Sequence, residues 1–293
     1  MKYLSLLSIT LLFAACTSHT AGPDADEASI NSLQLKLASN NLKYATPMKE
    51  YGIEGYYTGP FVADEMDPNK NGMYANKITI SIDSLVNMQV YGHSIVAGNF
   101  RPFKGSYTHE QALWTFDVSE PGDNKYDGKF SFTLMDNTIW LEGTWVANDK
   151  NLAVSSRSYK LEKRDFAYDP ELALPEDVTY DGVYGSYKED NDESEVITSD
   201  ALKFNASTQL LKKEDIENMY KADLEVLRNS IYARHGYSFK NRRMRYVFDN
   251  YVDWYMPVSV DITADLTELE RKNIELIKRY EVHAEKYYDV FGR

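Results

Sequence analysis

The chain has 293 residues, of which 43% are hydrophobic and 26% charged, and its formal net charge is −13. This composition is typical of a folded globular protein and excludes collagen-like, low-complexity and fully disordered chains. The length is sufficient for two compact domains. The acidic excess argues against nucleic acid as a partner. The single cysteine excludes an internal disulfide framework and any metal site built from several cysteines.

The first fifteen residues have the features of a secretory sorting signal. Lys2 supplies a positive charge, and the mostly apolar run that follows stops at Cys16. That run is shorter than the about 20 apolar residues that a membrane-spanning helix needs. Phe13-Ala14-Ala15-Cys16 resembles the bacterial lipoprotein lipobox, in which small residues precede a cysteine that is lipidated. The resemblance implies a signal peptide over residues 1–15 and a lipid anchor on Cys16, and an ordinary secretory signal is the alternative.

Residues 16–49 are predicted to form a flexible tether. They contain Gly22-Pro23, few aromatic residues, and the acidic residues Asp24, Asp26 and Glu27. Acidic residues soon after a lipidated cysteine resemble the surface-export signal of some Gram-negative lipoproteins. We therefore expect an extracytoplasmic protein in the envelope of a Gram-negative bacterium, anchored to its outer membrane. The membrane would be the first partner, and the leaflet that the protein faces stays open.

Residues 50–165 are predicted to form an all-β domain. Apolar and polar residues alternate with a period of two over 78–82, 130–134 and 139–145, a spacing typical of half-buried strands. Further strands are expected over 86–91, 94–97, 103–107, 112–118 and 153–161. Turn-forming sequences separate these segments, so about eight or nine short antiparallel strands should close into a barrel or a sandwich.

A Gly-x-aromatic motif recurs in this domain, at Gly55-Tyr56-Tyr57, Gly105-Ser106-Tyr107 and Gly143-Thr144-Trp145. Glycine lets a coiled strand bend, and the aromatic ring fills the space beside it. In this motif alone, the segment resembles lipocalin-like barrels. A barrel filled by its own aromatic side chains is the favoured interpretation. A carrier of a small apolar ligand is the alternative, and it would need a cavity larger than about 300 Å³.

Two segments have part of a calcium-loop pattern. Residues 67–72 match its first six positions, but Ile78 stands where the loop requires a bidentate glutamate. In residues 123–128, Lys125 stands where a third ligand should be. Both segments are predicted to be Asx-type turns, and we expect no metal and no cofactor.

The composition changes near residue 166. Residues 166–200 contain Asp169-Pro170, Leu174-Pro175 and five acidic residues within 189–195, which indicates an acidic linker. A small hairpin could pair residues 183–188 with 196–202. From residue 201 to 293 the apolar period is helical, so the whole chain is predicted to have an α+β fold, with the β domain first and a small helical domain after it.

The helical domain contains a family signature. The sequence from Leu227 to Phe239, which includes Tyr232-Ala233-Arg234-His235-Gly236, resembles the signature of the YARHG domain. The similarity covers about residues 202 to 281. The aromatic pair Trp254-Tyr255 and a closing helix from Leu266 to Tyr280 belong to the same resemblance. It implies an extracytoplasmic domain of bacterial proteins, often lipoproteins, without an established activity.

A helical wheel divides the signature helix into faces. Leu224, Leu227, Ile231 and His235 share one face, Arg228 and Arg234 flank it, and Tyr232 lies just beyond Arg228. Val226, Asn229 and Ala233 are expected to point the other way. Gly236 should end the helix in a left-handed conformation. An internal hydrogen-bond network is the favoured interpretation of Arg234, whereas a ligand site and an internal role are equally weighted for His235.

Basic residues are concentrated within residues 226–248, without an acidic residue among them: Arg228, Arg234, Lys240, Arg242, Arg243 and Arg245. A second helix is predicted to bury Met244, Val247, Phe248 and Tyr251 and to point its arginines outward. Such a surface could bind an anionic envelope component, namely a lipid phosphate, a peptidoglycan carboxylate or an acidic peptide. A solvated face is the alternative.

Thr267 and Glu270 have the spacing of a capping box at the start of a third helix. The stripe of this helix that should pack inward consists of Leu266, Leu269, Asn273, Leu276, Ile277 and Tyr280.

These features favour a non-enzymatic, lipid-anchored binding or scaffolding module of the envelope. Its candidate binding residues are Arg228, Tyr232, Arg234, His235, Arg242, Arg243 and Arg245. No catalytic residue is assigned, because the sequence has no recognisable catalytic constellation. The alternative is an enzyme that acts on cell-wall or glycan substrates with His235 as general acid–base. That alternative needs an Asp or Glu within hydrogen-bond reach of His235.

Overall fold

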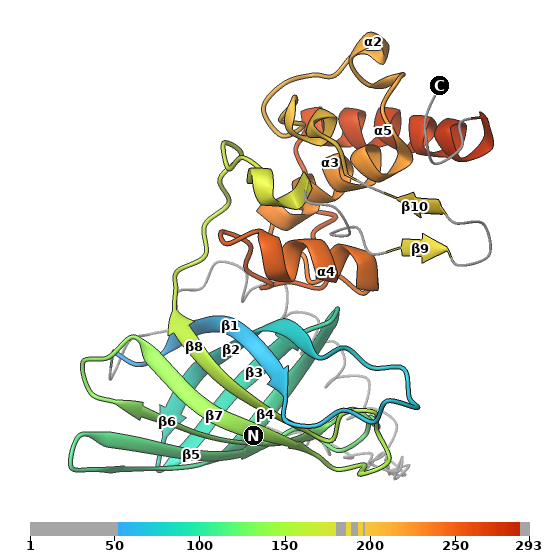
Figure 1. Ribbon diagram of the computed structural model, residues 1–293. Coiled ribbons are helices and arrows are strands. Elements are labelled where there is room, and N and C mark those ends of the chain that lie inside the picture. Colours follow the sequence, from blue (N-terminus) through green and yellow to red (C-terminus); the bar gives the residue numbers. More distant parts are fainter. Residues whose placement is uncertain (1–51, 180–185, 189–192, 196, 288–293) are drawn as a thin grey trace, which may run out of the picture. The chain divides into compact units, whose positions relative to one another are not determined.

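The computed structural model describes residues 52–179, 186–188, 193–195 and 197–287. The expected signal peptide, Cys16 and the tether lie outside the described residues. An antiparallel β-barrel is followed by a helical region, which confirms the predicted α+β fold (Figure 1). Within the described ranges, every helix is too short or too polar to cross a membrane.

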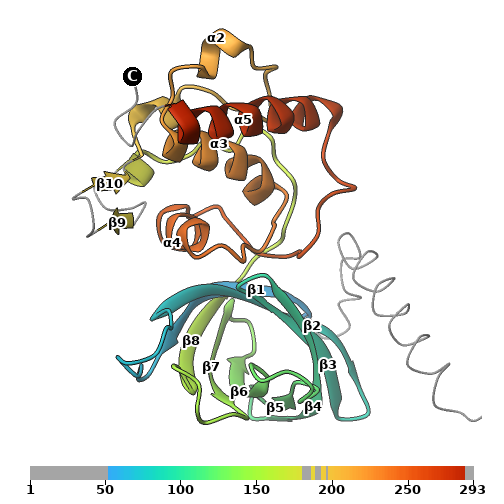
Figure 2. The same cartoon turned by 90° about the vertical axis from the view of Figure 1, so that its right-hand side faces the viewer.

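The β domain is a closed barrel and not a sandwich. In the described part of the chain it has eight strands: β1 (Gly55–Ala63), β2 (Ala75–Val86), β3 (Gln89–Val96), β4 (Asn99–Glu110), β5 (Leu113–Ser119), β6 (Gly128–Met135), β7 (Trp140–Ala147) and β8 (Ser156–Lys163). Each strand pairs antiparallel with the next, and β8 returns to pair with β1 (Figure 2). Closure leaves the sheet without an open edge.

The strand pattern differs from the sequence prediction in two ways: β1 was not among the expected strands, and one turn lies at a different place. The strands expected over 86–91 and 94–97 are a single strand, β3, and the turn before it lies at Asn87 and Met88, which both have positive φ. Gly92 is in the middle of β3, where a Cβ would lie 2.1 Å from the Ser81 carbonyl oxygen. This glycine therefore permits a close approach between strands and does not mark a turn.

Aromatic and aliphatic side chains fill the centre of the barrel, as the favoured interpretation of the sequence predicts. Phe116 and Phe132 stack with ring centroids 4.7 Å apart, and Phe61, Phe130 and Trp145 pack against one another. All five rings are buried within one core cluster. Burial of this apolar area is the main contribution to the stability of the barrel.

The segment between the barrel and the helices contains short elements. Strands β9 (Ser186–Lys188) and β10 (Glu193–Glu195) pair as a hairpin, and η1 (Glu176–Thr179) and η2 (Ser199–Leu202) are 3₁₀ helices. The prediction that residues 196–202 form the second strand of the hairpin was wrong, because that strand is β10. Thr198 caps η2 and donates two hydrogen bonds, from its backbone N–H and its hydroxyl, to Asp223, so residues 199–202 turn into a helix instead.

The helical domain contains α2 (Lys213–Ile216), α3 (Lys221–Arg234), α4 (Arg242–Tyr251) and α5 (Glu268–Tyr287). Leu224, Leu227 and Ile231 of α3 share a core cluster with residues of α5. The expectation that Val226, Asn229 and Ala233 point away from the core was wrong. All three are buried, and Val226 and Ala233 pack in a second cluster with residues of α4. Helix α3 lies between two neighbours, and a wheel with one apolar face could not represent that.

The two predicted helix signals are confirmed. Gly236 has φ +70 and follows the last turn of α3. At the start of α5, the Thr267 N–H donates to Glu270 Oε2 at 2.9 Å and the Glu270 N–H donates to Thr267 Oγ1 at 3.2 Å, which is a complete capping box. Asn273 and Ile277 of the predicted α5 stripe are buried.

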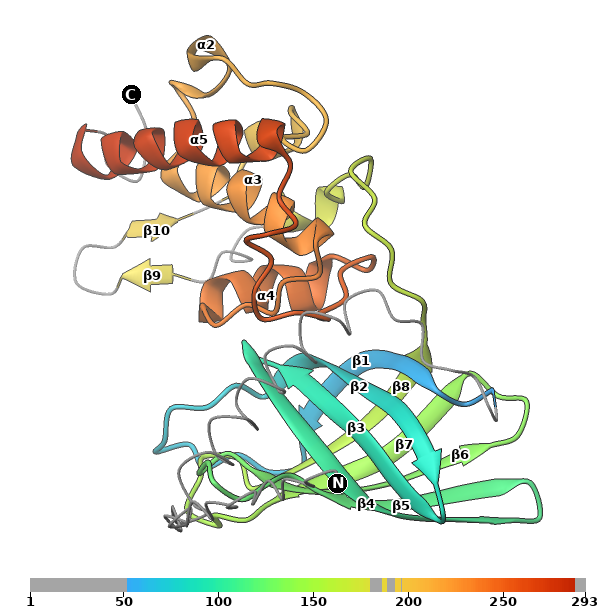
Figure 3. The same ribbon diagram turned by 180° about the vertical axis from the view of Figure 1, so that it is seen from behind.

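The barrel and the helical domain belong to one compact unit, Lys43–Arg293. Helix α4 contacts the barrel through β2, and α3 contacts both α4 and α5 (Figures 1 and 3). The Lys77 N–H donates to Asp249 Oδ2 at 2.9 Å, and Lys77 Nζ donates to the carbonyl oxygens of Val252 and Tyr255. These bonds hold α4 and the residues after it against strand β2.

We expect Gly236→Ala to lower the free energy of unfolding by about 2–3 kcal/mol, because it adds a Cβ at positive φ and overpacks the site. That Cβ would lie 2.4 Å from Val258 Cγ2 and 2.9 Å from the Phe166 ring. Gly122→Ala is the control, because Gly122 also has positive φ but its Cβ would meet nothing closer than 3.9 Å. Chemical denaturation should give a cost of about 1 kcal/mol for the control. Equal costs for the two variants would contradict the close contact at Gly236.

Candidate functional site

Arg234 of the signature lies inside the helical domain. Its side chain is 2% exposed. Nε donates to the Leu172 carbonyl oxygen at 2.8 Å, and Nη1 donates to the hydroxyls of Ser230 at 3.0 Å and Ser207 at 3.3 Å. Burial lowers the pKa of the guanidinium to about 10, so it stays charged at neutral pH. Arg234 therefore connects α3 to two distant segments through internal hydrogen bonds, as the favoured interpretation predicts.

His235 also makes internal contacts. Its Nε2 lies 2.9 Å from Glu270 Oε2, and its ring stacks on Tyr168 with centroids 4.2 Å apart. His235 is 6% exposed and Glu270 is fully buried. The Tyr168 hydroxyl donates to Glu270 Oε1 at 3.0 Å, while Thr267 donates to Oε2. The carboxylate that the enzyme hypothesis needs beside His235 is thus present, but both of its oxygens already accept hydrogen bonds from the protein.

The pKa of Glu270 reflects this network. Burial by itself would raise the pKa, but the hydrogen bonds from His235 and from the Thr267 backbone N–H outweigh burial and lower the pKa to about 2. The carboxylate is consequently charged at all physiological pH values, which makes it a poor proton donor and a stable acceptor for the cap of α5.

Arg228 and Tyr232 have a different environment from Arg234 and His235. They line a groove of about 810 Å³ between α3, the segment 260–266 and the first half of α5. The Arg228 guanidinium lies over the Tyr232 ring and donates from Nε to Glu281 Oε1 at 2.6 Å. The groove has an apolar lining of Tyr232, Tyr237, Phe239, Met244, Ile262, Leu266 and Ile274, with four basic residues, Arg228, Lys240, Arg271 and Lys278, and three acidic ones, Glu225, Asp261 and Glu275.

The arginines of α4 do not all point outward as expected. The predicted apolar face is confirmed by burial of Met244, Val247 and Phe248. Arg242, however, donates to the Asn71 side chain and to the Gly72 carbonyl oxygen, and Arg245 donates to the Lys240 carbonyl oxygen at 2.5 Å and to Met73 Sδ at 3.1 Å. Arg243 pairs with Glu225 at 3.5 Å. Because α4 packs beside the barrel, Arg242 and Arg245 at the edge of its apolar face reach polar atoms of the β1–β2 loop.

Arg242 and Arg245 also reach a cavity of about 560 Å³ at one end of the barrel. Arg101, Glu120, Asp127 and Arg157 line the same cavity. These four residues come from different strands and loops and have no common spacing, so no sequence pattern predicts them as a site. The turn at residues 123–128 was the one local signal, and Asp127 from that turn faces the cavity.

The two calcium-like segments are turns. Asp67 Oδ1 accepts the Asn69 N–H at 3.0 Å, and Asn124 Oδ1 accepts the Tyr126 N–H at 3.0 Å, which confirms the Asx-type geometry. Over the residues that the structure describes, no cluster of three or more His, Cys, Asp or Glu side chains is arranged to hold a metal ion.

Comparison with known families identifies a domain in the helical part of the chain. Residues 199–282 match the family model of the YARHG domain, so the chain carries a YARHG domain at these positions. YARHG domains occur in extracytoplasmic proteins, which agrees with an envelope location. No curated protein and no solved structure matches the chain.

We expect acid to weaken the fold through Glu270. A carboxyl group whose pKa falls from 4.5 unfolded to about 2 folded stabilises the protein above the unfolded pKa, and this stabilisation is lost as the pH falls from 4.5 towards 2. The loss amounts to at most about 3 kcal/mol. Denaturation between pH 6 and pH 2 should therefore give a shallower acid dependence for Glu270→Gln than for the native chain. Glu268→Gln, an exposed position two residues before Glu270, should retain the native dependence. An unchanged slope in Glu270→Gln would contradict the lowered pKa.

Proposed function

We propose that this protein is a non-enzymatic binding protein of the cell envelope, anchored to the outer membrane through a lipidated Cys16, whose YARHG domain holds a short acidic peptide in the groove at Arg228 and Tyr232. One observation carries the proposal. The signature is divided between two environments: Arg234 and His235 are buried in internal contacts, whereas Arg228 and Tyr232 line an open groove.

The family supports a peptide as the ligand, because the YARHG domain is regarded as an extracellular peptide-binding module. The lining of the groove supports the choice of peptide. Its aromatic and aliphatic residues suit one apolar side chain, and its basic residues, Lys240, Arg271 and Lys278 with Arg228, outnumber its acidic ones. Aromatic anchors surrounded by charged groups are the usual pattern of peptide recognition.

A binding role, in preference to catalysis, is supported by the surroundings of His235. A general acid–base must reach its substrate, and both His235 and Glu270 are buried and hydrogen-bonded inside the domain. The membrane anchor is supported by the lipobox-like sequence that ends at Cys16. The net charge of −13 supports the exclusion of nucleic acid as a partner. No cofactor is part of the proposal.

We expect Lys278→Glu to weaken binding of an acidic peptide with one central aromatic residue by about tenfold at low salt, which corresponds to about 1.4 kcal/mol. Lys278 lines the groove near the middle of α5, so a carboxylate there would repel the acidic ligand. Fluorescence anisotropy with the purified full chain and a labelled peptide measures the effect. The difference between variants should shrink at high salt, because salt screens exposed charges.

The matched control is Lys272→Glu. Lys272 is also an exposed lysine of α5, but it pairs with Glu268 and does not line the groove. Binding to Lys272→Glu should equal binding to the native chain, and a peptide with lysines in place of its acids should bind weakly to all three. Equal losses in the two variants, or no binding of the acidic peptide to the native chain, would overturn the proposed function.

A further inference from the structure

Unpartnered polar groups are concentrated at one place in the molecule. Among the described residues, four buried side-chain atoms make no hydrogen bond within the protein: Asn76 Oδ1, Arg101 Nε, Asp127 Oδ1 and Arg245 Nε. All four residues line the cavity at the end of the barrel. An unpartnered polar atom that is buried costs about 1–3 kcal/mol. Four of them in residues around one cavity therefore give this cavity a polar lining that suits a polar ligand.

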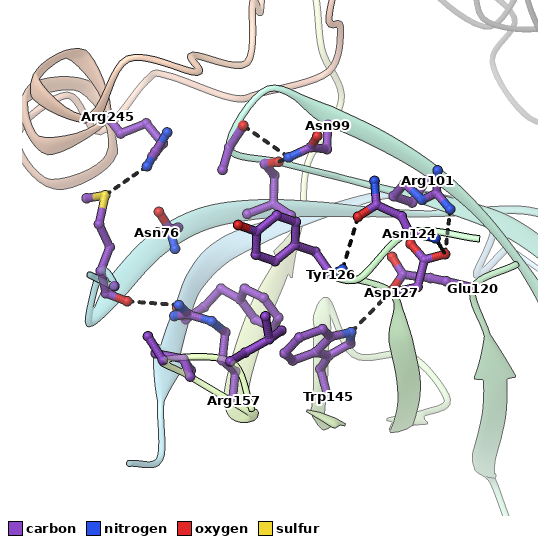
Figure 4. A pocket seen from close by; sticks show the side chains of 18 of the residues that line it. Asn76, Asn99, Arg101, Glu120, Asn124, Tyr126, Asp127, Trp145, Arg157 and Arg245 are labelled. Carbon is purple, nitrogen blue, oxygen red and sulfur yellow. Dashed lines mark hydrogen bonds and ion pairs between the residues drawn. The ribbon is translucent and has the colours of Figure 1, made fainter. Parts of the chain in front are cut away.

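Barrel and helical domain both contribute to this cavity. The β1–β2, β3–β4, β5–β6 and β7–β8 connections lie at the same end of the barrel, because neighbouring strands run antiparallel, and each contributes to the lining. Arg242 and Arg245 of α4 complete the rim. Figure 4 shows Arg101, Asp127 and Glu120 on one side, Arg157 and Arg245 on the other, and Tyr126 between the two groups. The volume of about 560 Å³ is within the range of small-ligand sites.

The cationic side has guanidinium groups that no carboxylate neutralises directly. Arg157 is 8% exposed and donates to the backbone carbonyl oxygens of Phe61, Met73 and Tyr74 at 2.8–3.0 Å. Within the described ranges, Arg157, Arg242 and Arg245 form no ion pair. Burial lowers the pKa of Arg157 to about 10, so this charge persists at neutral pH. A concentration of positive charge in a protein of net charge −13 favours an anionic ligand group on this side.

The opposite side offers acceptors. Asp127 is fully buried, and its Oδ2 accepts from Arg101 at 2.5 Å and from the Gly122 N–H at 2.8 Å, while Oδ1 has no partner. Glu120 Oε2 accepts from the Gly128 N–H and from Trp145 Nε1, which holds the indole ring in the wall of the cavity. A ligand hydroxyl or amide N–H could donate to Asp127 Oδ1. Asn76 Oδ1, which lies on the side of Arg157 and Arg245 in Figure 4, could accept a second one.

The aromatic and aliphatic parts of the wall come from Phe61, Phe130, Trp145 and Leu152, with Tyr126 over the centre. Flat aromatic faces pack well against the C–H face of a sugar ring. An apolar ligand, the alternative considered from the sequence, would leave the four polar atoms unpartnered and the arginines desolvated. The lining therefore favours a ligand with polar groups over a purely apolar cargo, although the cavity is large enough for one.

We propose that this cavity binds an acidic sugar, with its carboxylate at Arg157 and Arg245, its hydroxyls at Asp127 and Asn76, and its ring against Trp145 and Tyr126. The ligand class follows from the groups around the cavity: Arg245 Nε requires an acceptor, Asp127 Oδ1 and Asn76 Oδ1 require donors, and Arg157 adds a second positive charge on the side of Arg245. Inorganic phosphate could satisfy the arginines but would not use the aromatic wall. This site is separate from the groove of the YARHG domain, and it does not depend on the function proposed for that groove.

Isothermal titration of the purified full chain with glucuronate and with N-acetylneuraminate tests the proposal, with neutral glucose and inorganic phosphate as the comparison ligands. We expect a dissociation constant of about 1 mM or tighter for at least one acidic sugar, and none measurable for glucose. Arg245→Gln removes a cationic group from the rim. Leu152→Trp fills part of the cavity without changing any charge. This second variant tests the site independently if the loss of Arg245 disturbs the fold. Both variants should weaken binding at least tenfold.

Arg243→Gln is the matched control, because Arg243 belongs to the same helix but does not line the cavity. It should bind acidic sugar as the native chain does. Three results would overturn the proposal: no saturable binding of either acidic sugar, binding that is unchanged in both Arg245→Gln and Leu152→Trp, or binding of phosphate or glucose that equals that of the acidic sugars.

Discussion

The helical domain depends on the burial of one charged side chain, Arg234. A guanidinium removed from water must have its N–H groups satisfied, or the domain loses several kcal/mol. Here the carbonyl oxygen of Leu172 and the hydroxyls of Ser207 and Ser230 accept from it. Leu172 and Ser207 lie outside α3, so these bonds fix the approach of the chain to the helix. The neighbouring pair of His235 and Glu270 fixes the start of α5 in the same way.

This internal use of Arg234 and His235 determines what the remainder of the signature can do. Arg228 and Tyr232 occupy the part of α3 beside the groove, and they are held in place by Glu281 and by the two core clusters. A rigid helix with an anchored basic and aromatic edge is suited to recognition, because little side-chain entropy remains to be lost on binding. The placement of Arg242 and Arg245 likewise determines what they can contact. Both lie on α4 and face the barrel, so they contribute to its cavity.

Much of the fold follows from local sequence signals. The period of two between residues 78 and 145 predicts the barrel, and Gly236 and the Thr267–Glu270 box predict two helix ends, because each signal depends on neighbours in the chain. The candidate sites depend on tertiary packing. A helical wheel gives the faces of α4 but not the element beside each face, so it could not place Arg245 at the barrel. The cavity brings together Asn76, Arg101, Asp127 and Arg157 through closure of the barrel, which leaves no short-range pattern.

The central claim is that the signature has a buried part that supports the fold, Arg234 and His235, and a half-buried part beside the groove that binds ligand, Arg228 and Tyr232. Hydrogen–deuterium exchange of the full chain, with and without an acidic peptide that has one central aromatic residue, tests this claim most directly. We predict slower exchange over residues 225–232 and 260–278, which border the groove, and no change in the barrel strands. Protection confined to the barrel, or none at any backbone amide under saturating peptide, would contradict it.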